Sequence, residues 1–441
     1  MSLIPQVAQA LQTVLTTDAD AAAKKTGFVQ RESKLTGSAF AQTLVFGWLS
    51  NPEATLEELA QTAGGVGVPI TAQGLDQRFT CQAAALLHLL LEAAVHHLIH
   101  TDPVALPLLQ RFSGVCVQDS STVGLPPELG QIWPGGGQEA AVKLQVRVDL
   151  LTGQMTGPLL QPAQRHDRSS PLQQAPLPKG ALRLADLGYF SLDVFQQIQA
   201  QKGFFLSRLQ VQTRLLDPAG VPLDLPAFLA AQSADEVDRP ILLGITHRLK
   251  ARLLAVRVAP EIAQQRRRDL HRQAQKKGQA VSQARLALCD WTILVTNVPP
   301  WLVTLPEALV LHRIRWQVEL LFKLWKSHGH LDKSRSSKSW RILCEVYAKL
   351  LGCLIQHWVF LVSCWSYPNR SLVKARKAVQ RYALHLACVV RSFHQLCESL
   401  AFIQKCLQNG CRVNKRKKAP AAYQLLENPY VTYKSNSYAL A

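Results

Sequence analysis

The chain has 441 residues, of which 48% are hydrophobic and 18% charged, a composition that argues against wholesale disorder and suits roughly two to four domains. Its formal net charge of +19 favours a polyanionic partner, because each neutralised phosphate releases counterions. The excess is local, since residues 311–441 contain 22 Lys/Arg against 5 Asp/Glu, whereas residues 1–100 contain 5 against 8. Contact with nucleic-acid phosphates is therefore expected in the C-terminal third.

The ten cysteines are scattered without a CxxC pair, so the sequence predicts no zinc site. Reduced thiols indicate a reducing cytoplasm. The N-terminus lacks the basic start and apolar core of a signal peptide. The most apolar run, residues 350–365, is shorter than the ~20 residues of a membrane span and contains Gln356 and His357. It is interpreted as a buried helix of a soluble protein with no membrane partner.

Residues 1–105 are predicted to form a helical N-terminal domain. Thr55 and Glu58 have the spacing of a capping box, and Thr71 is placed to cap another short helix after a glycine-rich turn. This pattern fits a DNA-binding helix-turn-helix, and it fits plain helix packing equally well. Both interpretations remain open at the level of sequence.

Short apolar strands are predicted within residues 106–214. The segment FSGVCVQDSS is interpreted as a strand that ends on Asp119, and LRLADLGYF as a strand that ends on Asp186. Between them, AVKLQVRVDLLTGQMTG alternates apolar and polar residues around a Thr-Gly turn, which is typical of an antiparallel hairpin. A helix and another strand follow. The order of elements predicts an α/β fold, with a mixed sheet flanked by helices.

Residues 215–290 interrupt this pattern and are expected to form an insertion domain, with two strand-like segments and a strongly basic helix at residues 261–278. The sheet is expected to resume with WTILVTNVP, and a long helix to run from about residue 306 to 326. Residues 291–335 would thus complete the core. Residues 336–441 are predicted to be a basic helical region that ends in a lysine-rich tail.

Asp119 and Asp186 are candidate metal ligands because open sheets place ligands at the ends of their strands. Mg²⁺ and Mn²⁺ prefer oxygen ligands and are often held by two or three carboxylates. Two such ions about 4 Å apart support phosphoryl transfer. A single aspartate after a strand often only forms a turn, so the metal-site prediction depends on the presence of both aspartates.

A third acid, Glu319, lies on the predicted helix HRIRWQVELLFKLWK. Arg315, Lys323 and Lys326 fall on the same face of that helix, at spacings of three or four residues. The same spacing also fits a solvated stripe of salt bridges. The expected buried side consists of Trp316, Leu320 and Leu324.

These residues match a known pattern. His312, Arg315, Glu319 and Lys326 are similar in spacing to the Tyr-Arg-Glu-Lys signature of DDE transposases of the insertion-sequence-four type. The resemblance extends to VQDSST, AVKLQVRVDLLTG, LADLGYF and WTILVTNVP, and it covers residues 112–330. It implies a ribonuclease-H-like catalytic core with a β-containing insertion, flanked by helical N- and C-terminal regions.

By resemblance, Asp119, Asp186 and Glu319 are the catalytic triad that binds two Mg²⁺ or Mn²⁺ ions. Arg315 and Lys326 would contact the phosphates of a transposon end, together with Lys323 and His312. Trp291 would stack on a base flipped from the duplex, although it also fits an ordinary core tryptophan. The residues of the triad and the DNA contacts are Asp119, Asp186, Glu319, Trp291, His312, Arg315, Lys323 and Lys326.

His312 departs from the signature, which has tyrosine at this position. Histidine can also hydrogen-bond a phosphate, more strongly when protonated, but it replaces the phenol ring. The expected function is metal-dependent cleavage of double-stranded DNA at inverted-repeat transposon ends and strand transfer into target DNA. A homodimer on DNA, at the nucleoid in a prokaryotic cytoplasm, is expected. The alternatives are a transposase-derived DNA-binding protein that does not cleave and a metal-dependent nuclease without strand transfer.

Overall fold

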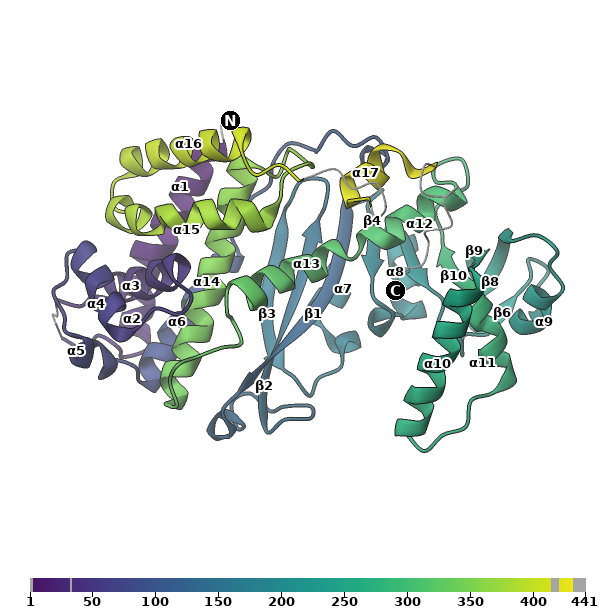
Figure 1. The fold of residues 1–441 in the computed structure, drawn as a ribbon, viewed down its shortest axis with the longest axis horizontal. Helices are drawn as coiled ribbons and strands as arrows, with labels where there is room; N and C mark the ends of the chain where they lie inside the picture. The colour runs from purple at the N-terminus through teal and green to yellow at the C-terminus, as the bar shows by residue number, and fades with distance from the viewer. Residues whose placement is uncertain (1–2, 32–33, 414–419, 431–441) are drawn as a thin grey trace. The chain divides into compact units, whose positions relative to one another are not determined.

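The computed structural model describes residues 3–31, 34–413 and 420–430, and the chain divides into two compact units (Figure 1). Unit 1 consists of Met1–Ala105, Asp119–Arg165 and Val318–Asn414. Unit 2 consists of Leu106–Gln118, His166–Gln317 and Lys415–Ala441. Each unit is therefore built from three segments that lie far apart in the sequence.

Unit 1 is mostly helical. Its α-helices are α1 (Leu3–Thr13), α2 (Ala19–Lys25), α3 (Gly37–Ser50), α4 (Leu56–Gly65), α5 (Ala72–Asp76), α6 (Cys81–Val95), most of α13 (Gln317–Lys323), α14 (Ser339–Ser363), α15 (Leu372–Val389) and α16 (Phe393–Asn409). Every residue of α3 except Ser50 is buried, as expected for a helix that is apolar on all sides. α14 packs on α3 and α6, and α15 also packs on α3.

The predicted buried helix at residues 350–365 is confirmed as the second half of α14. By length and hydropathy alone α14 could cross a membrane, but its most apolar stretch lies wholly inside the protein. Core helices of this kind pass the same test. The predicted caps are also confirmed: Glu58 N donates to Thr55 Oγ1 at 3.2 Å and Thr55 N to Glu58 Oε2 at 2.7 Å, while Gly74 N donates to Thr71 Oγ1 at 3.1 Å.

The described residues form ten strands. They are β1 (Val115–Leu125), β2 (Ala140–Asp149), β3 (Met155–Pro162), β4 (Leu182–Ala185), β5 (Phe204–Arg208), β6 (Leu215–Leu216), β7 (Pro222–Leu223), β8 (Glu236–Leu243), β9 (Leu249–Arg257) and β10 (Trp291–Thr296). Most pairings are antiparallel, but β1–β4 and β4–β5 are parallel. The mixed α/β class is as predicted.

In unit 1, β2 and β3 form the predicted antiparallel hairpin. Its turn contains Gly153 with φ +72, a left-handed conformation that glycine adopts without a steric cost. In unit 2, the first four residues of β1 are followed in the sheet by β4, β5, β10, β9, β8, β6 and β7. β8 and β9 come from the predicted insertion, and they extend this sheet because β9 pairs with β10 from Trp291↔Arg257 to Thr296↔Arg252.

The remaining helices belong to unit 2: α7 (Pro171–Gln174), α8 (Leu192–Ala200), α9 (Leu225–Ala230), α10 (Pro260–Lys276), α11 (Gln283–Ala287), α12 (Leu305–Ile314) and α17 (Ala422–Glu427). α8 packs on β5 and β9. Phe195 of α8 stacks on Phe205 of β5 with ring centroids 4.2 Å apart. Around this stack, apolar residues of the sheet form a core that includes Leu253 and Val295. This core holds β5, which pairs with β4, the strand that precedes Asp186.

Candidate active site

Asp119 lies in the middle of β1, so the prediction that its strand ends there is wrong. β1 continues to Leu125, and Val123 and Leu125 are buried in alternation beyond the acid. The strand therefore continues through DSST, and its buried and exposed residues alternate only from Thr122 onward. The parallel pairing with β4 does end nearby, at Gln118↔Ala185. The half-buried Asp119 carboxylate accepts a hydrogen bond from Ser120 N at 2.8 Å.

Asp186 directly follows β4, as predicted, and begins a short helical turn at residues 187–189. Its side chain is half exposed, and Oδ1 lies 3.8 Å from Arg315 Nη2. An ion pair at that distance and exposure contributes little to stability. The carboxylate thus stays accessible to solvent at the end of a buried strand.

Arg208 is a site residue that the sequence analysis missed. Asp186 and Arg208 each lie two residues beyond the last paired residues of β4 and β5, Leu184 and Leu206. Because neighbouring parallel strands end at the same edge of a sheet, this register brings the two positions to one edge. A basic residue that ends a strand next to the Asp186 strand was the signal available in the sequence.

The predicted long helix from residue 306 to 326 is interrupted. α12 ends at Ile314, a turn follows at Arg315 and Trp316, and α13 begins at Gln317. Trp316 N bonds to Arg313 O at 3.2 Å, so the i−4 ladder is replaced there by a tighter turn. Residues 324–328 then form a π-helical turn. Such turns often occur at functional sites.

The break moves the buried face of the helix that carries Glu319. Trp316 is 50% exposed and Leu320 is 36% exposed, although both were predicted to be buried; Leu324 is buried as predicted. The buried side chains of this segment are Val318, Leu321, Phe322, Leu324 and Trp325. Glu319 is partly exposed and Lys323 is exposed.

His312 lies near the end of α12, where burial lowers its pKa to about 3. The neighbouring Arg315 and Arg208 lower it further, while Asp186 opposes them. The imidazole is therefore neutral at pH 7 and offers one N–H donor rather than two. The stronger hydrogen bond of a protonated histidine is not available in the folded chain alone.

Lys326 lies in unit 1, in the π-helical turn. Its ammonium donates to Thr122 O of β1 at 2.6 Å, three residues along the strand from Asp119. Burial lowers the pKa of Lys326, and Asp332 partly offsets this. A cation is thus fixed by hydrogen bonding to the same strand that carries Asp119.

Trp291 begins β10 and is 5% exposed. The Arg257 guanidinium lies 4.4 Å from the centre of its ring, and Arg266 Nη1 donates to Trp291 O at 3.0 Å. As folded, this residue packs as a core tryptophan with a cation–π contact. A flipped base could reach the covered ring face only if Arg257 moved, so base stacking here stays a prediction.

The structure brings three of the predicted site residues together in unit 2, and in unit 1 it ties Lys326 to the strand that carries Asp119. Unit 2 gathers His312, Arg315 and Asp186, and unit 1 contains Asp119, Glu319, Lys323 and Lys326. Within residues 3–31, 34–413 and 420–430, no group of three His, Cys, Asp or Glu side chains is close enough to hold a metal ion. The donor chemistry nevertheless fits a hard divalent cation, since all three acids are partly exposed carboxylates.

Comparison with known proteins places this site in a family context. The family described as transposase DDE domain matches residues 110–355, which enclose all eight predicted site residues. The transposase for insertion sequence element IS231B of Bacillus thuringiensis subsp. berliner is 26% identical over 388 residues, 82% of this chain and 80% of that protein. The transposase for insertion sequence element IS1151 of Clostridium perfringens is 25% identical over 371 residues, 77% of each chain.

Proposed function

The chain belongs to the transposase DDE domain family of enzymes that act on DNA, and from this premise we propose that it cleaves DNA at the ends of an insertion sequence and joins the freed strand to target DNA. The relatives are named as transposases of insertion sequence elements, and matches of this length cover most of the chain. The finer assignments, a ribonuclease-H-like core and the insertion-sequence-four signature, are part of the proposal.

One observation carries the assignment of the site. The parallel pairing of β1 with β4 stops at Gln118 and Ala185, and the next residue of each strand is an acid, Asp119 and Asp186. Carboxylates that follow the last paired residues of adjacent strands are well placed to share a ligand. Glu319, on α13, is proposed as the third member.

The family implies dependence on a divalent metal. We assign its ligands to Asp119, Asp186 and Glu319, and its identity to Mg²⁺ or Mn²⁺, with two ions. When bound, such ions activate the attacking water or hydroxyl and stabilise the leaving oxygen. The hydrogen bond from Ser120 N orients Asp119, and the Arg315 guanidinium lies 3.8 Å from the Asp186 carboxylate.

Four other side chains are assigned to the DNA backbone. Arg315, Lys323 and Lys326 are proposed to contact phosphates, and the neutral His312 to donate one hydrogen bond. The partners are inverted-repeat ends and target DNA, bound by a homodimer at the nucleoid of a bacterial cytoplasm. The basic residues of the C-terminal third supply the non-specific part of the affinity.

The test is nicking of a plasmid that carries the DNA flanking the coding region, with Mg²⁺ or Mn²⁺. Asp119→Asn, Asp186→Asn and Glu319→Gln should each reduce nicking to background while leaving end binding intact. Asp193→Asn is the matched control, because Asp193 is 80% exposed on α8, where it pairs with His247 at 2.9 Å. Nicking at the wild-type rate by any triad variant would refute the assignment. End binding by a wild-type chain that never nicks would favour a DNA-binding protein without cleavage.

A further inference from the structure

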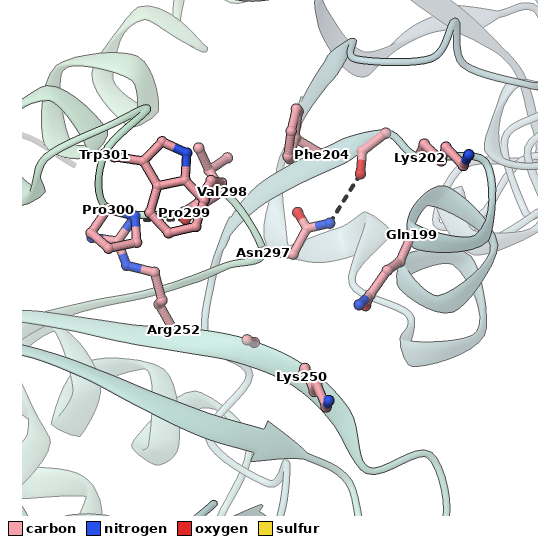
Figure 2. Close-up of a pocket in the computed structure, with 12 residues that line it drawn as sticks. Gln199, Lys202, Phe204, Lys250, Arg252, Asn297, Val298, Pro299, Pro300 and Trp301 are labelled. Atoms are coloured by element: carbon pink, nitrogen blue, oxygen red, sulfur yellow. Dashed lines mark hydrogen bonds between the residues drawn. The ribbon is translucent and has the colours of Figure 1, made fainter.

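A pocket of about 460 Å³ lies in unit 2, and no residue of the proposed triad lines it (Figure 2). Its walls come from the end of α8, the start of β5, β9 and the loop after β10. Its volume falls within the about 300–1,000 Å³ that is typical of small-ligand sites. Figure 2 shows the Trp301 ring at one end of the pocket and Gln199 and Lys202 at the other.

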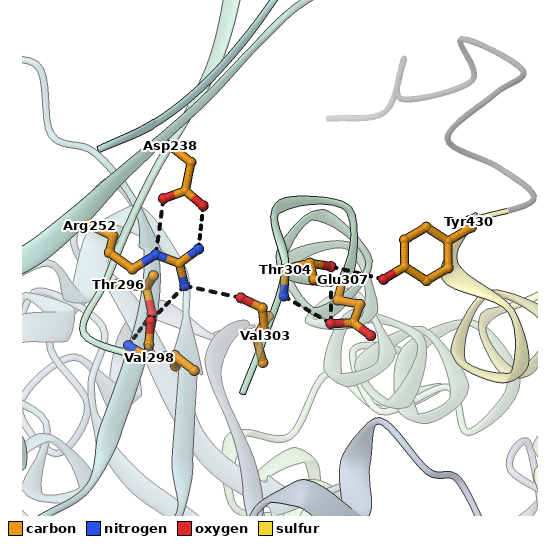
Figure 3. Close-up of polar contacts among 8 residues, drawn as sticks. All are labelled: Asp238, Arg252, Thr296, Val298, Val303, Thr304, Glu307 and Tyr430. Carbon is orange, nitrogen blue, oxygen red and sulfur yellow. Dashed lines mark hydrogen bonds and ion pairs between the residues drawn. The ribbon is translucent and has the colours of Figure 1, made fainter. Parts of the chain in front are cut away.

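Trp301 is 84% exposed, an unusual position for the largest apolar side chain. The loop that presents it is held firmly, because the buried Arg252 donates to Val298 O at 2.7 Å and to Val303 O at 3.0 Å (Figure 3). Arg252 is itself fixed by Asp238, whose Oδ1 accepts from Nε at 3.0 Å. Two prolines, Pro299 and Pro300, stiffen the chain directly before the ring.

A second arginine also forms a hydrogen bond to the backbone of this loop. Arg111 Nη1 donates to Leu302 O at 2.8 Å. Three backbone carbonyl groups around Trp301 therefore accept hydrogen bonds from guanidinium groups. Because the loop is already ordered, a ligand that binds the ring does not have to supply the entropic cost of ordering it. A rigid, exposed aromatic ring is the usual platform on which an unpaired base stacks.

The polar groups of the pocket suit a nucleotide. Lys202 and Lys250 are exposed, and no acidic side chain is among the residues that line the pocket. Asn297 is fully used within the chain, because its Oδ1 accepts from Phe205 N at 2.8 Å and its Nδ2 donates to Gly203 O at 3.0 Å.

We propose that this pocket binds one unpaired nucleotide of DNA. The base stacks on Trp301, and the adjoining phosphates lie between Lys202 and Lys250. A paired base inside a duplex has no free face for the ring, so the ligand is a single-stranded or extruded nucleotide. The proposal rests on the proposed function for its DNA substrate, but it involves a tryptophan other than Trp291.

The test measures binding of a short fluorescent oligothymidylate to the full chain in EDTA, at about 200 mM salt to suppress non-specific contacts. Trp301→Ala should weaken binding about 5- to 150-fold, the range expected for the loss of one base–aromatic stack. Trp301→Phe should restore most of the affinity. Trp340→Ala, which removes another partly exposed tryptophan from α14, should leave it unchanged.

Salt dependence separates stacking from charge. Trp301→Ala should leave the slope of log affinity against log salt unchanged, whereas Lys202→Gly should reduce it by about 0.7, the value for one phosphate of a single strand. Lys202 has φ +58, so glycine relieves backbone strain at this position and the variant should fold. A 5-iodouracil base in the oligonucleotide should photocrosslink to Trp301.

An unchanged affinity for Trp301→Ala, or an equal loss of affinity for a blunt duplex, would overturn the pocket assignment. Neither measurement requires metal or cleavage, so the two proposals fail separately. A chain that nicks DNA but binds the oligonucleotide independently of Trp301 refutes only the pocket. A chain that never nicks but shows the Trp301 dependence refutes only the proposed function.

Discussion

Glu307 fastens the start of α12, the helix that carries His312, and its removal gives a quantitative test of the structure. Arg111 Nη1 and Nη2 donate to its two oxygens at 2.9 and 2.8 Å, and Thr304 N donates to Oε2 at 2.9 Å (Figure 3 shows the Thr304 contacts). The side chain of Glu307 is only 5% exposed, whereas that of Arg111 is 36% exposed. Glu307→Gln keeps the shape and one acceptor, but it removes the charge and turns an amide NH₂ toward a guanidinium.

The expected cost can be bounded from these contacts. A hydrogen bond to a charged group contributes about 1.5–3 kcal/mol, and removing one partner of a buried pair costs about 3–5 kcal/mol. Arg111 can be rehydrated because it is partly exposed, which places the loss near about 2 kcal/mol. Amide hydrogen exchange in α12 should therefore accelerate about 30-fold at pH 7. Glu236→Gln, at an exposed position on β8, is the control and should leave it unchanged.

The pH dependence provides the sharper check. The pKa of Glu307 is lowered from 4.5: burial raises it, but the hydrogen bonds from Arg111 and Thr304 and the Arg111 charge outweigh that effect. A depressed carboxyl pKa stabilises the fold above pH 4.5, and this contribution is lost as pH falls through the lowered pKa. The difference in unfolding temperature between wild type and Glu307→Gln should thus shrink in acid. A difference that is constant from pH 7 to pH 3, or unchanged exchange in α12, would refute the reasoning.

Two further predictions follow from single positions. The pKa of His312 is lowered from 6.5 to about 3, so between these pH values the unfolded chain binds a proton that the folded chain does not, and the free energy of unfolding decreases as pH decreases. In thermal unfolding, the melting temperature of the wild type should therefore decrease relative to that of His312→Gln from pH 7 to pH 4. Parallel curves for the two proteins would contradict the burial of His312. Gly153→Ala should destabilise unit 1 by about 2 kcal/mol or more, because φ is +72 and the added carbon would lie 2.4 Å from Leu361 Cδ2; urea unfolding with an unchanged midpoint would exclude this clash.

Local features of the fold were predictable because their causes are local. The capping box of Thr55 and Glu58 and the hairpin turn at Gly153 depend on a few adjacent side chains. The extent of β1 was mispredicted because Asp119 and its neighbours resemble a turn, and only the burial of Val123 and Leu125 shows that the strand continues. No sequence pattern distinguishes a turn at Asp119 from a continuing strand, because the tendency of a segment to form a strand depends on the residues that its faces pack against.

The candidate site was predictable as a set of residue types, but its details depend on distant contacts. Spacing alone suggested a continuous helix through Arg315, whereas the chain turns at Trp316 and exposes that side chain. The neutral state of His312 likewise requires knowledge of its burial and of Arg208, about a hundred residues earlier in the sequence. The proximity of residues so far apart in the sequence is set by tertiary packing, which no local sequence pattern shows.

The assembly of unit 1 from distant segments has a consequence for synthesis. The apolar helices α6 and α3 are synthesised roughly 240 and 290 residues before α14, on which both pack. At about 5–20 residues per second, their apolar surfaces stay uncovered by α14 for roughly 10–60 s. Nascent chains are therefore exposed to aggregation for most of translation. Slower translation lengthens this interval, so the risk of aggregation rises with the time between the synthesis of α3 and α6 and that of α14.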